Sequence, residues 1–465
     1  MVHESVQRAV SPQQLSIPPR NGIRAIGHLK RGAKFRLLGT GPERIAKDGR
    51  GVVNERNWPG THRFAASGIH RPRTIDDLRR LVAKAEKIHA VGARHSFNGV
   101  ADSPGALVDL AGLPPRCEID AARRTVTVDA GACYGRVAAE LQARGWALHN
   151  MASLPQVTVI GAVATGTHGS GDGNGTLSSA VAGLEVVTAA GDLVTMRRGD
   201  AGFDGMVVGL GAFGIVTAVT LDIRPSFLVR QDAFAGLPWS AALTDLGRIM
   251  AAAYSVSIMT KWSGPTLGRL WLKTLVVDGM PEAVSYPGAH PAPTVGERAD
   301  EAVFRRTVFG TVGPWSERLP HCIPDEEPGH PDQIQSEYML PRGQAMKALA
   351  LLRDMGTRID PHLRVTEIRS MAADALWLSP AYGHDAVALH FTWLKEPEPV
   401  AKLTAEIEEM LLPLGARPHW GKLMHASAAQ LAPLYPRLAA FRELSTAWDP
   451  AGKFRNDFLD RHVFG

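Results

Sequence analysis

Glu367 and Arg369 are two charged residues inside one apolar segment. Residues 365–370, Val-Thr-Glu-Ile-Arg-Ser, are typical of a strand, and alternation along a strand would put both charged side chains on one face. Burying a charge is unfavourable unless it is paired or faces a polar cavity. The pattern therefore indicates either a structural ion pair, Glu367 with Arg369 or with Lys422, or a polar binding site.

Two further segments add polar groups of the same kind. Residues 386–393 predict a second apolar strand, in which His390 and Thr392 share a face. Lys422 follows Pro-His-Trp-Gly at residues 418–421, so it adds a cation beside an aromatic side chain. Together these residues could supply donors and acceptors for a ligand rich in hydroxyl groups.

Glycine is unusually dense between residues 161 and 175. The six glycines are Gly161, Gly166, Gly169, Gly171, Gly173 and Gly175. His168 is the one long side chain among them. Small residues let a backbone approach a ligand and present N–H groups to it. A flexible surface loop is the alternative, but the apolar run at residues 157–163 favours a loop held against a core.

His95 lies in the glycine-started segment Gly-Ala-Arg-His-Ser-Phe-Asn at residues 92–98. A single histidine in such a loop is more often an ordinary loop residue. The segment resembles, however, the cofactor-attachment loop of the FAD-linked oxidases of the vanillyl-alcohol oxidase type. In these proteins the histidine of a GxxHSF motif bonds the 8α-methyl group of the flavin. Further blocks match that family in order, at residues 150–155, 158–169 and 449–456.

Within this family the chain is most similar to the alditol oxidases, over nearly everything after residue 57. The resemblance implies FAD attached covalently through His95. Arg94 stands where many relatives have glycine. The implied cofactor-binding residues are His95, Gly92, Ala93, Arg94, Ser96, Phe97, Ser153, Thr158, Gly161, Ala162, Val163, Ala164, Gly166, His168, Gly214 and Ile215. The implied substrate-binding residues are Ser153, Glu367, Arg369, Thr392 and Lys422, of which Arg369, Lys422 and Glu367 are implied to be catalytic.

The implied activity is oxidation of the terminal primary alcohol of an alditol, such as xylitol or sorbitol, to the aldose, with O₂ reduced to H₂O₂. Ser153, Glu367 and Thr392 would hold the hydroxyl groups, while Arg369 and Lys422 would stabilise alkoxide character. Two alternatives stay open. One is an aldonolactone oxidase or dehydrogenase of the gulonolactone type, and the other is a non-catalytic carbohydrate-binding relative.

The segments around these residues predict mixed α+β structure. Apolar residues recur at helical spacing over residues 75–88, after an N-cap at Thr74, and a short strand follows at 89–91. Other predicted strands lie at residues 107–110, 116–120, 125–129, 184–188, 193–196 and 215–223, and another helix at 134–144. A G-x-G-x-x-G match at residues 209–214 leads into a β-branched run and not a helix, which disfavours a nicotinamide-type site.

The resemblance implies a two-domain FAD-binding fold of the PCMH type, with an antiparallel substrate domain covering the flavin. The expected boundaries are a basic leader at 1–50, a FAD-binding domain at 51–226, a substrate domain at 227–427, and a segment at 428–465 that returns to the FAD domain. Residues 283–335 look rich in loops.

Composition and charge are those of a globular protein, with 45% hydrophobic and 21% charged residues. Residues 1–50 hold ten Lys/Arg and three Asp/Glu, so the basic excess lies in a leader that we expect to be disordered, and no nucleic-acid partner is expected. No apolar stretch predicts a membrane span, and the spacing of Cys117, Cys133 and Cys322 predicts neither disulfides nor a metal site. A cytoplasmic location and a polyol and O₂ as small-molecule partners are expected, while the oligomeric state is open, with a monomer among the options.

Overall fold

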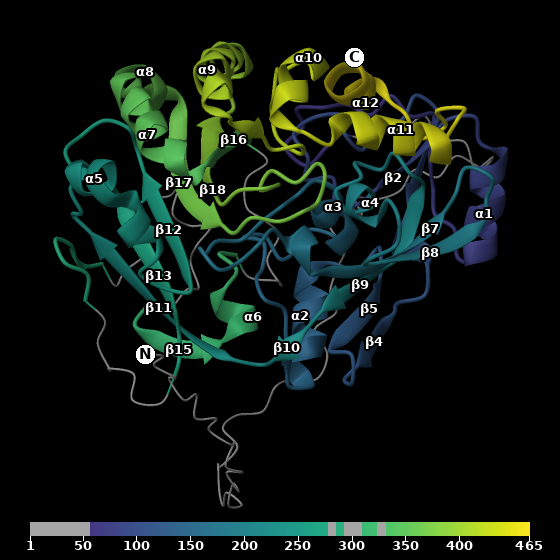
Figure 1. Ribbon diagram of the computed structural model, residues 1–465, viewed down its shortest axis with the longest axis horizontal. Coiled ribbons are helices and arrows are strands. Elements are labelled where there is room, and N and C mark those ends of the chain that lie inside the picture. The colour runs from purple at the N-terminus through teal and green to yellow at the C-terminus, as the bar shows by residue number, and fades with distance from the viewer. Residues whose placement is uncertain (1–55, 278–284, 293–308, 323–331) are drawn as a thin grey trace, which may run out of the picture. The chain divides into compact units, whose positions relative to one another are not determined.

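A nine-stranded antiparallel sheet dominates the second half of the chain in the computed structural model, which describes residues 56–277, 285–292, 309–322 and 332–465. Figure 1 shows this sheet with helices on its outer side. The strand order is β14-β11-β13-β12-β17-β18-β16-β19, and β15 pairs with β11. The strands are β11 (Leu228–Ala235), β12 (Ser255–Thr260), β13 (Arg269–Leu275), β14 (His290–Pro291), β15 (Thr311–Pro314), β16 (Gln333–Pro341), β17 (Leu363–Met371), β18 (Ala386–Leu394) and β19 (Arg417–Pro418).

Strict alternation gives the central strands one apolar and one polar face. On β18, Leu389 and Phe391 point into an apolar core shared with the outer helices, and His390 and Thr392 therefore point the other way. The helices on that core side are α5 (Trp239–Met250), α7 (Ala345–Asp354), α8 (Gly356–Ile359) and α9 (Pro397–Leu411). The opposite face of the sheet is left for polar groups.

The first half of the chain forms smaller sheets. A five-stranded antiparallel sheet has the order β4-β5-β9-β7-β8, and a three-stranded parallel sheet has the order β1-β3-β2. These strands are β1 (Gly68–His70), β2 (Ile88–Val91), β3 (Ala106–Asp109), β4 (Cys117–Asp120), β5 (Thr125–Asp129), β7 (Val181–Val187), β8 (Leu193–Arg197) and β9 (Ile215–Asp222), while β6 (Trp146–Ala147) pairs with β10 (Arg224–Pro225). The remaining helices include α1 (Ile75–Lys84), α2 (Tyr134–Ala143), α3 (Val159–Ala164), α4 (Phe203–Val207), α6 (Trp315–Arg318), α10 (Ala428–Leu431), α11 (Leu438–Trp448) and α12 (Asp457–Leu459).

The α+β class and the large antiparallel sheet agree with the sequence prediction, and so do several local features. The Thr74 hydroxyl accepts a hydrogen bond from Asp77 N (3.0 Å) at the start of α1. The strand β9 follows the G-x-G-x-x-G segment, as expected for a site that does not bind a dinucleotide in the Rossmann manner. The predicted leader lies outside the described residues, and the predicted domain boundaries stay a prediction.

Two local predictions were wrong. The helix α1 ends at Lys84 and not near residue 88, because Ile88 N donates to Lys453 O and Ile88 enters strand β2. Residues 159–164, expected as a loop that presents backbone N–H groups, form helix α3. There Ala162 N already donates to Thr158 O (3.1 Å), so this amide is taken up by the helix.

The C-terminal segment contacts the smaller sheets. Lys453 Nζ donates to Val82 O (2.7 Å) and Ala189 O (2.8 Å), and Asn456 Nδ2 donates to Asp102 O (2.8 Å). These bonds join residues more than 250 positions apart, so the end of the chain helps to fix the arrangement of its beginning.

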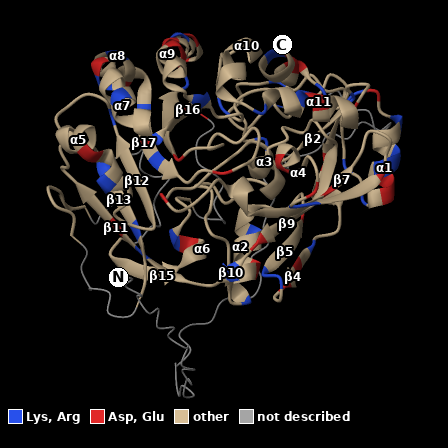
Figure 2. Cartoon of the chain, viewed as in Figure 1, with Lys and Arg blue, Asp and Glu red and all other residues tan. Residues whose placement is uncertain are grey.

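Charges on the described surface are mixed in sign. On α1, Arg79 pairs with Asp76 and Arg80 with Asp77, and Figure 2 shows basic and acidic positions together on that helix. In the described part of the chain, no helix is both long and apolar enough to cross a bilayer.

Candidate active site

The polar face of the large sheet carries a row of ionisable residues on three neighbouring strands. The register places Glu337 of β16 opposite His390 of β18, and His390 opposite Glu367 of β17. Two residues along each strand, Gln335 lies opposite Thr392. Residues directly opposite each other across strands have Cβ atoms about 5 Å apart, so this register forces the side chains into one cluster.

Arg369 connects this face to the first half of the chain. Its Nη2 donates to Ser153 Oγ (2.7 Å) and to Glu367 Oε2. Both charged side chains are buried, and they form the ion pair that the sequence pattern left as one alternative. Burial opposes ionisation of Glu367, but Arg369 outweighs it and the pKa of this carboxyl lies well below its usual range.

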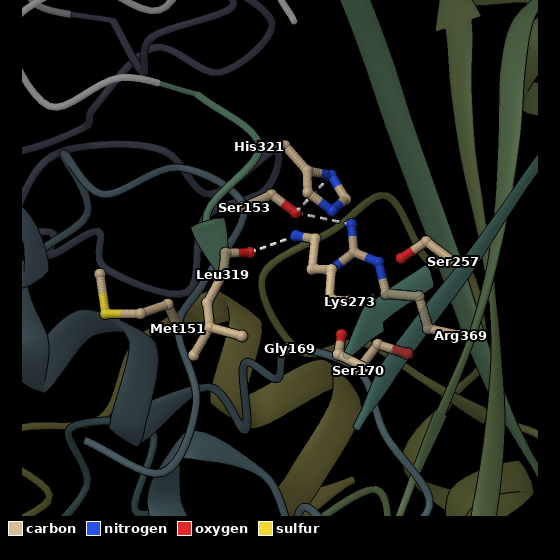
Figure 3. A pocket seen from close by; sticks show the side chains of 10 residues that line it. Met151, Ser153, Gly169, Ser170, Ser257, Lys273, Leu319, His321 and Arg369 are labelled. Carbon is tan, nitrogen blue, oxygen red and sulfur yellow. Dashed lines mark hydrogen bonds between the residues drawn. The ribbon is translucent and has the colours of Figure 1, made fainter. Parts of the chain in front are cut away.

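A small cavity adjoins Arg369, and Figure 3 shows Ser153, Arg369, Lys273 and His321 around it. Within the described residues, Glu367 Oε1, Arg369 Nε and Ser257 Oγ are buried without a hydrogen-bond partner. Unsatisfied buried polar atoms are unfavourable and uncommon in native proteins. Their concentration beside a cavity indicates a place where a polar ligand binds.

Lys422 is held at the end of the same polar face. Its Nζ donates to Gln335 Oε1 and lies 5.0 Å from the centre of the Phe97 ring. Burial lowers the pKa of this ammonium group to about 8, although nearby Glu337 acts in the opposite direction. Lys422 is therefore a cation that is easily neutralised, and it stands next to an aromatic ring from the His95 loop.

Glu337 is a buried acid that sequence reasoning missed. His168 Nε2 lies 3.0 Å from Glu337 Oε1, and His390 Nδ1 lies 3.3 Å from Oε2. Although burial disfavours its charge, these two histidines keep the pKa of Glu337 well below the usual range. Gln335 and Glu337 alternate, but Gln333 and Ser336 are polar as well, so the sequence does not mark Glu337 as a buried acid. Loops were expected only as far as residue 335, and Glu337 was given no role. His168, predicted to contact the cofactor, is paired with Glu337, and its contact with the cofactor stays a prediction.

The predicted attachment residue His95 packs against Trp58 on one face of its ring. The Trp58 ring stacks on the His95 ring, with centroids 4.9 Å apart and planes inclined by 15°. One ring nitrogen lies 3.0 Å from Ala93 O, and the other is buried with no hydrogen-bond partner in the described structure. Burial lowers the pKa of His95 to about 4, so the imidazole is neutral at pH 7 and keeps a lone pair. Arg94 precedes it with a φ of 60°, a conformation that favours glycine.

The His95 loop and the Lys422 turn are bonded to each other. Asn98 Nδ2 donates to Trp420 O (2.8 Å) and Lys422 O (2.7 Å), and Phe97 N donates to Gly421 O (2.8 Å). The structure thus brings His95, Ser96 and Phe97 beside Lys422, more than 300 residues away in sequence. Asn98 was quoted as part of the motif but was given no role.

Thr158 fills the space that side chains at two predicted cofactor-binding glycines would need. A Cβ on Gly92 would stand 2.3 Å from Thr158 Oγ1, and one on Gly161 would stand 2.7 Å from it. Gly166 has a φ of 67°, which again favours glycine. Close packing against Thr158 therefore explains glycine at positions 92 and 161, and their contact with the cofactor stays a prediction.

The other predicted cofactor residues lie around α3 and β9. Ala162 and Val163 are buried in α3, which ends at Ala164. Gly214 precedes β9, and Ile215 begins it opposite Val187; Ile160 of α3 packs against the same apolar cluster as Ile215. Ala162 and Val163 thus belong to the packed core, and Gly161 is the exposed residue of α3.

Comparison with known proteins shows to which family this chain belongs. An FAD binding domain model matches residues 66–197, and a D-arabinono-1,4-lactone oxidase model matches residues 330–462. The chain is 43% identical to an alditol oxidase of Streptomyces sp. over 411 residues, which cover 87% of this chain and 97% of that protein. The chain belongs to the alditol oxidase family. Membership makes it an FAD-dependent oxidoreductase.

More distant similarities agree with the fold of this family. An L-gulono-1,4-lactone dehydrogenase of Mycobacterium tuberculosis is 29% identical, over 88% of this chain and 98% of that protein. The crystal structure of a cholesterol oxidase from B. sterolicum superposes with a TM-score of 0.74 at 16% identity, over 92% of this chain and 99% of that one. At this identity the likeness concerns the fold alone. Among the described residues no group of three His, Cys, Asp or Glu could hold a metal ion.

Proposed function

We propose that this protein oxidises the terminal primary alcohol of an alditol to the aldose and passes the electrons to O₂, which becomes H₂O₂. The observation that carries the proposal is the set of unpartnered buried atoms, Glu367 Oε1 and Arg369 Nε, beside the Ser153 hydroxyl. A ligand that satisfies both must offer donors and acceptors close together. A hydroxyl group on each carbon gives an alditol that property.

The residues around His95 fit a covalently bound FAD. A neutral imidazole with a buried, unpartnered nitrogen is suited to bond the flavin, and Trp58 keeps the ring in one orientation. Gly92 and Gly161 both pack against Thr158, which brings these three predicted cofactor-binding residues together. When bound, FAD supplies hydride acceptance and reoxidation by O₂.

The remaining residues bind and polarise the substrate. Ser153, Glu367 and Thr392 hold hydroxyl groups, because each side chain presents an oxygen on or beside the polar face. Arg369 and Lys422 carry the positive charge that stabilises alkoxide character on the reacting oxygen. Preorganised charge in a site shielded from water acts more strongly than the same charge in solution.

Anaerobic titration with candidate substrates tests the proposal. Xylitol and sorbitol should bleach the flavin absorbance, and admitting air should restore it and release H₂O₂. The support for the aldonolactone alternative is the matching lactone oxidase model and the M. tuberculosis relative. Bleaching by L-gulono-1,4-lactone with inert alditols would replace our proposal by that alternative. No bleaching by either class would favour a non-catalytic relative.

The pH dependence of kcat/KM should report the charge on Lys422. Its pKa is lowered from 10.5 to about 8, so the fraction of protonated Lys422 falls as the pH rises above 8. If the ammonium form stabilises the alkoxide, kcat/KM for xylitol should decline about tenfold per pH unit above pH 8. In Lys422→Arg the decline should move to higher pH, because guanidinium stays charged. A rate that instead rises through pH 8 to a plateau would mean that neutral Lys422 accepts the proton.

We also propose a cytoplasmic location. Its support is that Cys117, Cys133 and Cys322, all among the described residues, form no disulfide.

A further inference from the structure

His321 lies beside Ser153 and Glu367, and it comes from a segment that was predicted to be rich in loops and was assigned no role. Its Nδ1 lies 3.3 Å from Ser153 Oγ and 3.5 Å from Glu367 Oε1. The imidazole is buried, and the edge of the Trp271 ring meets it with centroids 5.0 Å apart. Figure 3 shows His321 facing Ser153 across the cavity from Lys273.

The backbone around His321 is anchored independently of its side chain. His321 N and Cys322 N both donate to Ser153 O, at 3.1 and 3.0 Å. Residues 321 and 322 thus stay beside Ser153 whatever side chain stands at 321. This anchoring makes the effect of the imidazole experimentally separable from the effect of the loop.

The protonation state of His321 determines whether its imidazole can accept a hydrogen bond from Ser153. Burial and the neighbouring Lys273 lower the pKa of His321 well below its usual value, so the ring is neutral and has one N–H. Ser153 Oγ already accepts from Arg369 Nη2, which can only donate. His321 Nδ1 has two polar neighbours, and its contact with Ser153 Oγ has the geometry of a hydrogen bond. The other neighbour, Glu367 Oε1, has no hydrogen-bond partner in the described structure. Either group can donate in this contact; with the ring proton on Nε2, the Ser153 O–H donates to His321 Nδ1.

We propose that His321 is a positioning residue that turns the Ser153 hydroxyl into an acceptor toward the substrate and thereby selects ligands that donate hydrogen bonds. With its proton directed at His321, Ser153 offers only lone pairs to the cavity. Glu367 Oε1 beside it also accepts only. Two neighbouring acceptors suit an alditol, which brings O–H donors, and they disfavour the carbonyl oxygen of a lactone, which cannot donate. This inference rests on the proposed alditol oxidation.

The test compares His321→Phe with His321→Asn, in the wild-type chain and in a Ser153→Ala background. Phenylalanine keeps the ring volume but removes the acceptor, while asparagine can return an acceptor near the position of Nδ1. His321→Phe should raise KM for xylitol about 10- to 100-fold, the effect of losing one or two hydrogen bonds to a buried polar group, with a smaller change in kcat. His321→Asn should restore KM to within about threefold of the wild-type value.

The Ser153→Ala background separates positioning from a general structural effect. If His321 acts through Ser153, then His321→Phe should change KM less than about twofold there, because the group that it positions is absent. Effects that multiply in the double variant would overturn the proposal, as would an unchanged KM in His321→Phe or no recovery in His321→Asn.

A matched control is His362→Asn, which alters another histidine–glutamate pair. His362 Nδ1 contacts Glu396 in a half-exposed pair outside the cavity, so its kinetics should equal the wild type. Thermal midpoint and flavin content should be alike in all variants. The wild-type protein tests the proposed function by itself: if it oxidises no alditol, that function and this inference both fail. If it does but the variants behave otherwise than expected, the role of His321 alone fails.

Discussion

His95→Ala should lose all acid-stable flavin. Wild-type protein precipitated in acid and washed should give a yellow pellet, and the variant should give a colourless one, because the imidazole that would hold the cofactor is gone. The variant should still fold, because the loop is held by the bonds from Asn98 to Trp420 O and Lys422 O, which do not involve the His95 side chain. FAD bound without a covalent bond would remain in the supernatant after precipitation.

His62→Asn is the matched control for this experiment. His62 lies close to the loop, where a Cβ on Gly99 would be 3.1 Å from its ring, but it pairs with Asp102 and has no role in attachment. Its pellet should stay yellow. A wild-type pellet that is colourless while FAD appears in the supernatant would leave the fold intact and remove the covalent tether. A wild-type protein without any flavin would contradict the proposed cofactor itself.

Lys422→Met should nearly abolish turnover of xylitol while the protein stays yellow. Methionine keeps much of the side-chain length but removes the charge that stabilises the alkoxide. Removing one such preorganised donor in other enzymes lowers kcat about 100- to 1000-fold, and we expect a loss of that order. The loop itself should be maintained, because Asn98 binds the backbone carbonyl of Lys422 and not its side chain.

Stopped-flow measurement of anaerobic flavin reduction checks this prediction directly. Reduction by xylitol should slow in Lys422→Met, whereas reoxidation of dithionite-reduced flavin by O₂ reports whether the flavin site is intact. Lys402→Met, an exposed change on α9, should match the wild type. An unchanged rate of flavin reduction in Lys422→Met would remove this residue from the site.

The strands that carry the site were predictable because their apolar residues are interrupted at a period of two. Glu367 with Arg369, and His390 with Thr392, occupy the polar face on which alternation placed them. Helix α3 could not be recognised, because six residues inside a glycine-rich run carry too little periodicity. The early end of α1 depends on a bond from Ile88 to Lys453, a contact that no local pattern contains.

Glu337 and His321 are residues that could not be identified from the sequence. A buried acid is recognisable only once its partners are known, and the partners of Glu337 come from residues 168 and 390. His321 lies in a short segment without clear periodicity. Its proposed role depends on its contact with Ser153, which is 168 residues earlier in the chain. Sequence motifs thus led to predictions of the groups that would touch ligands, while Glu337 and His321 were found from the packing.

The bonds from Asn98 to the Lys422 turn also bear on the order of events during synthesis. A ribosome completes the His95 loop long before it reaches residue 422, so during that interval Asn98 has no carbonyl to bind and Phe97 no partner at Gly421. Asn456 and Lys453, which tie the early strands together, come later still. These contacts therefore cannot form before residue 456 has been synthesised, and we expect the proposed attachment of FAD to follow that step.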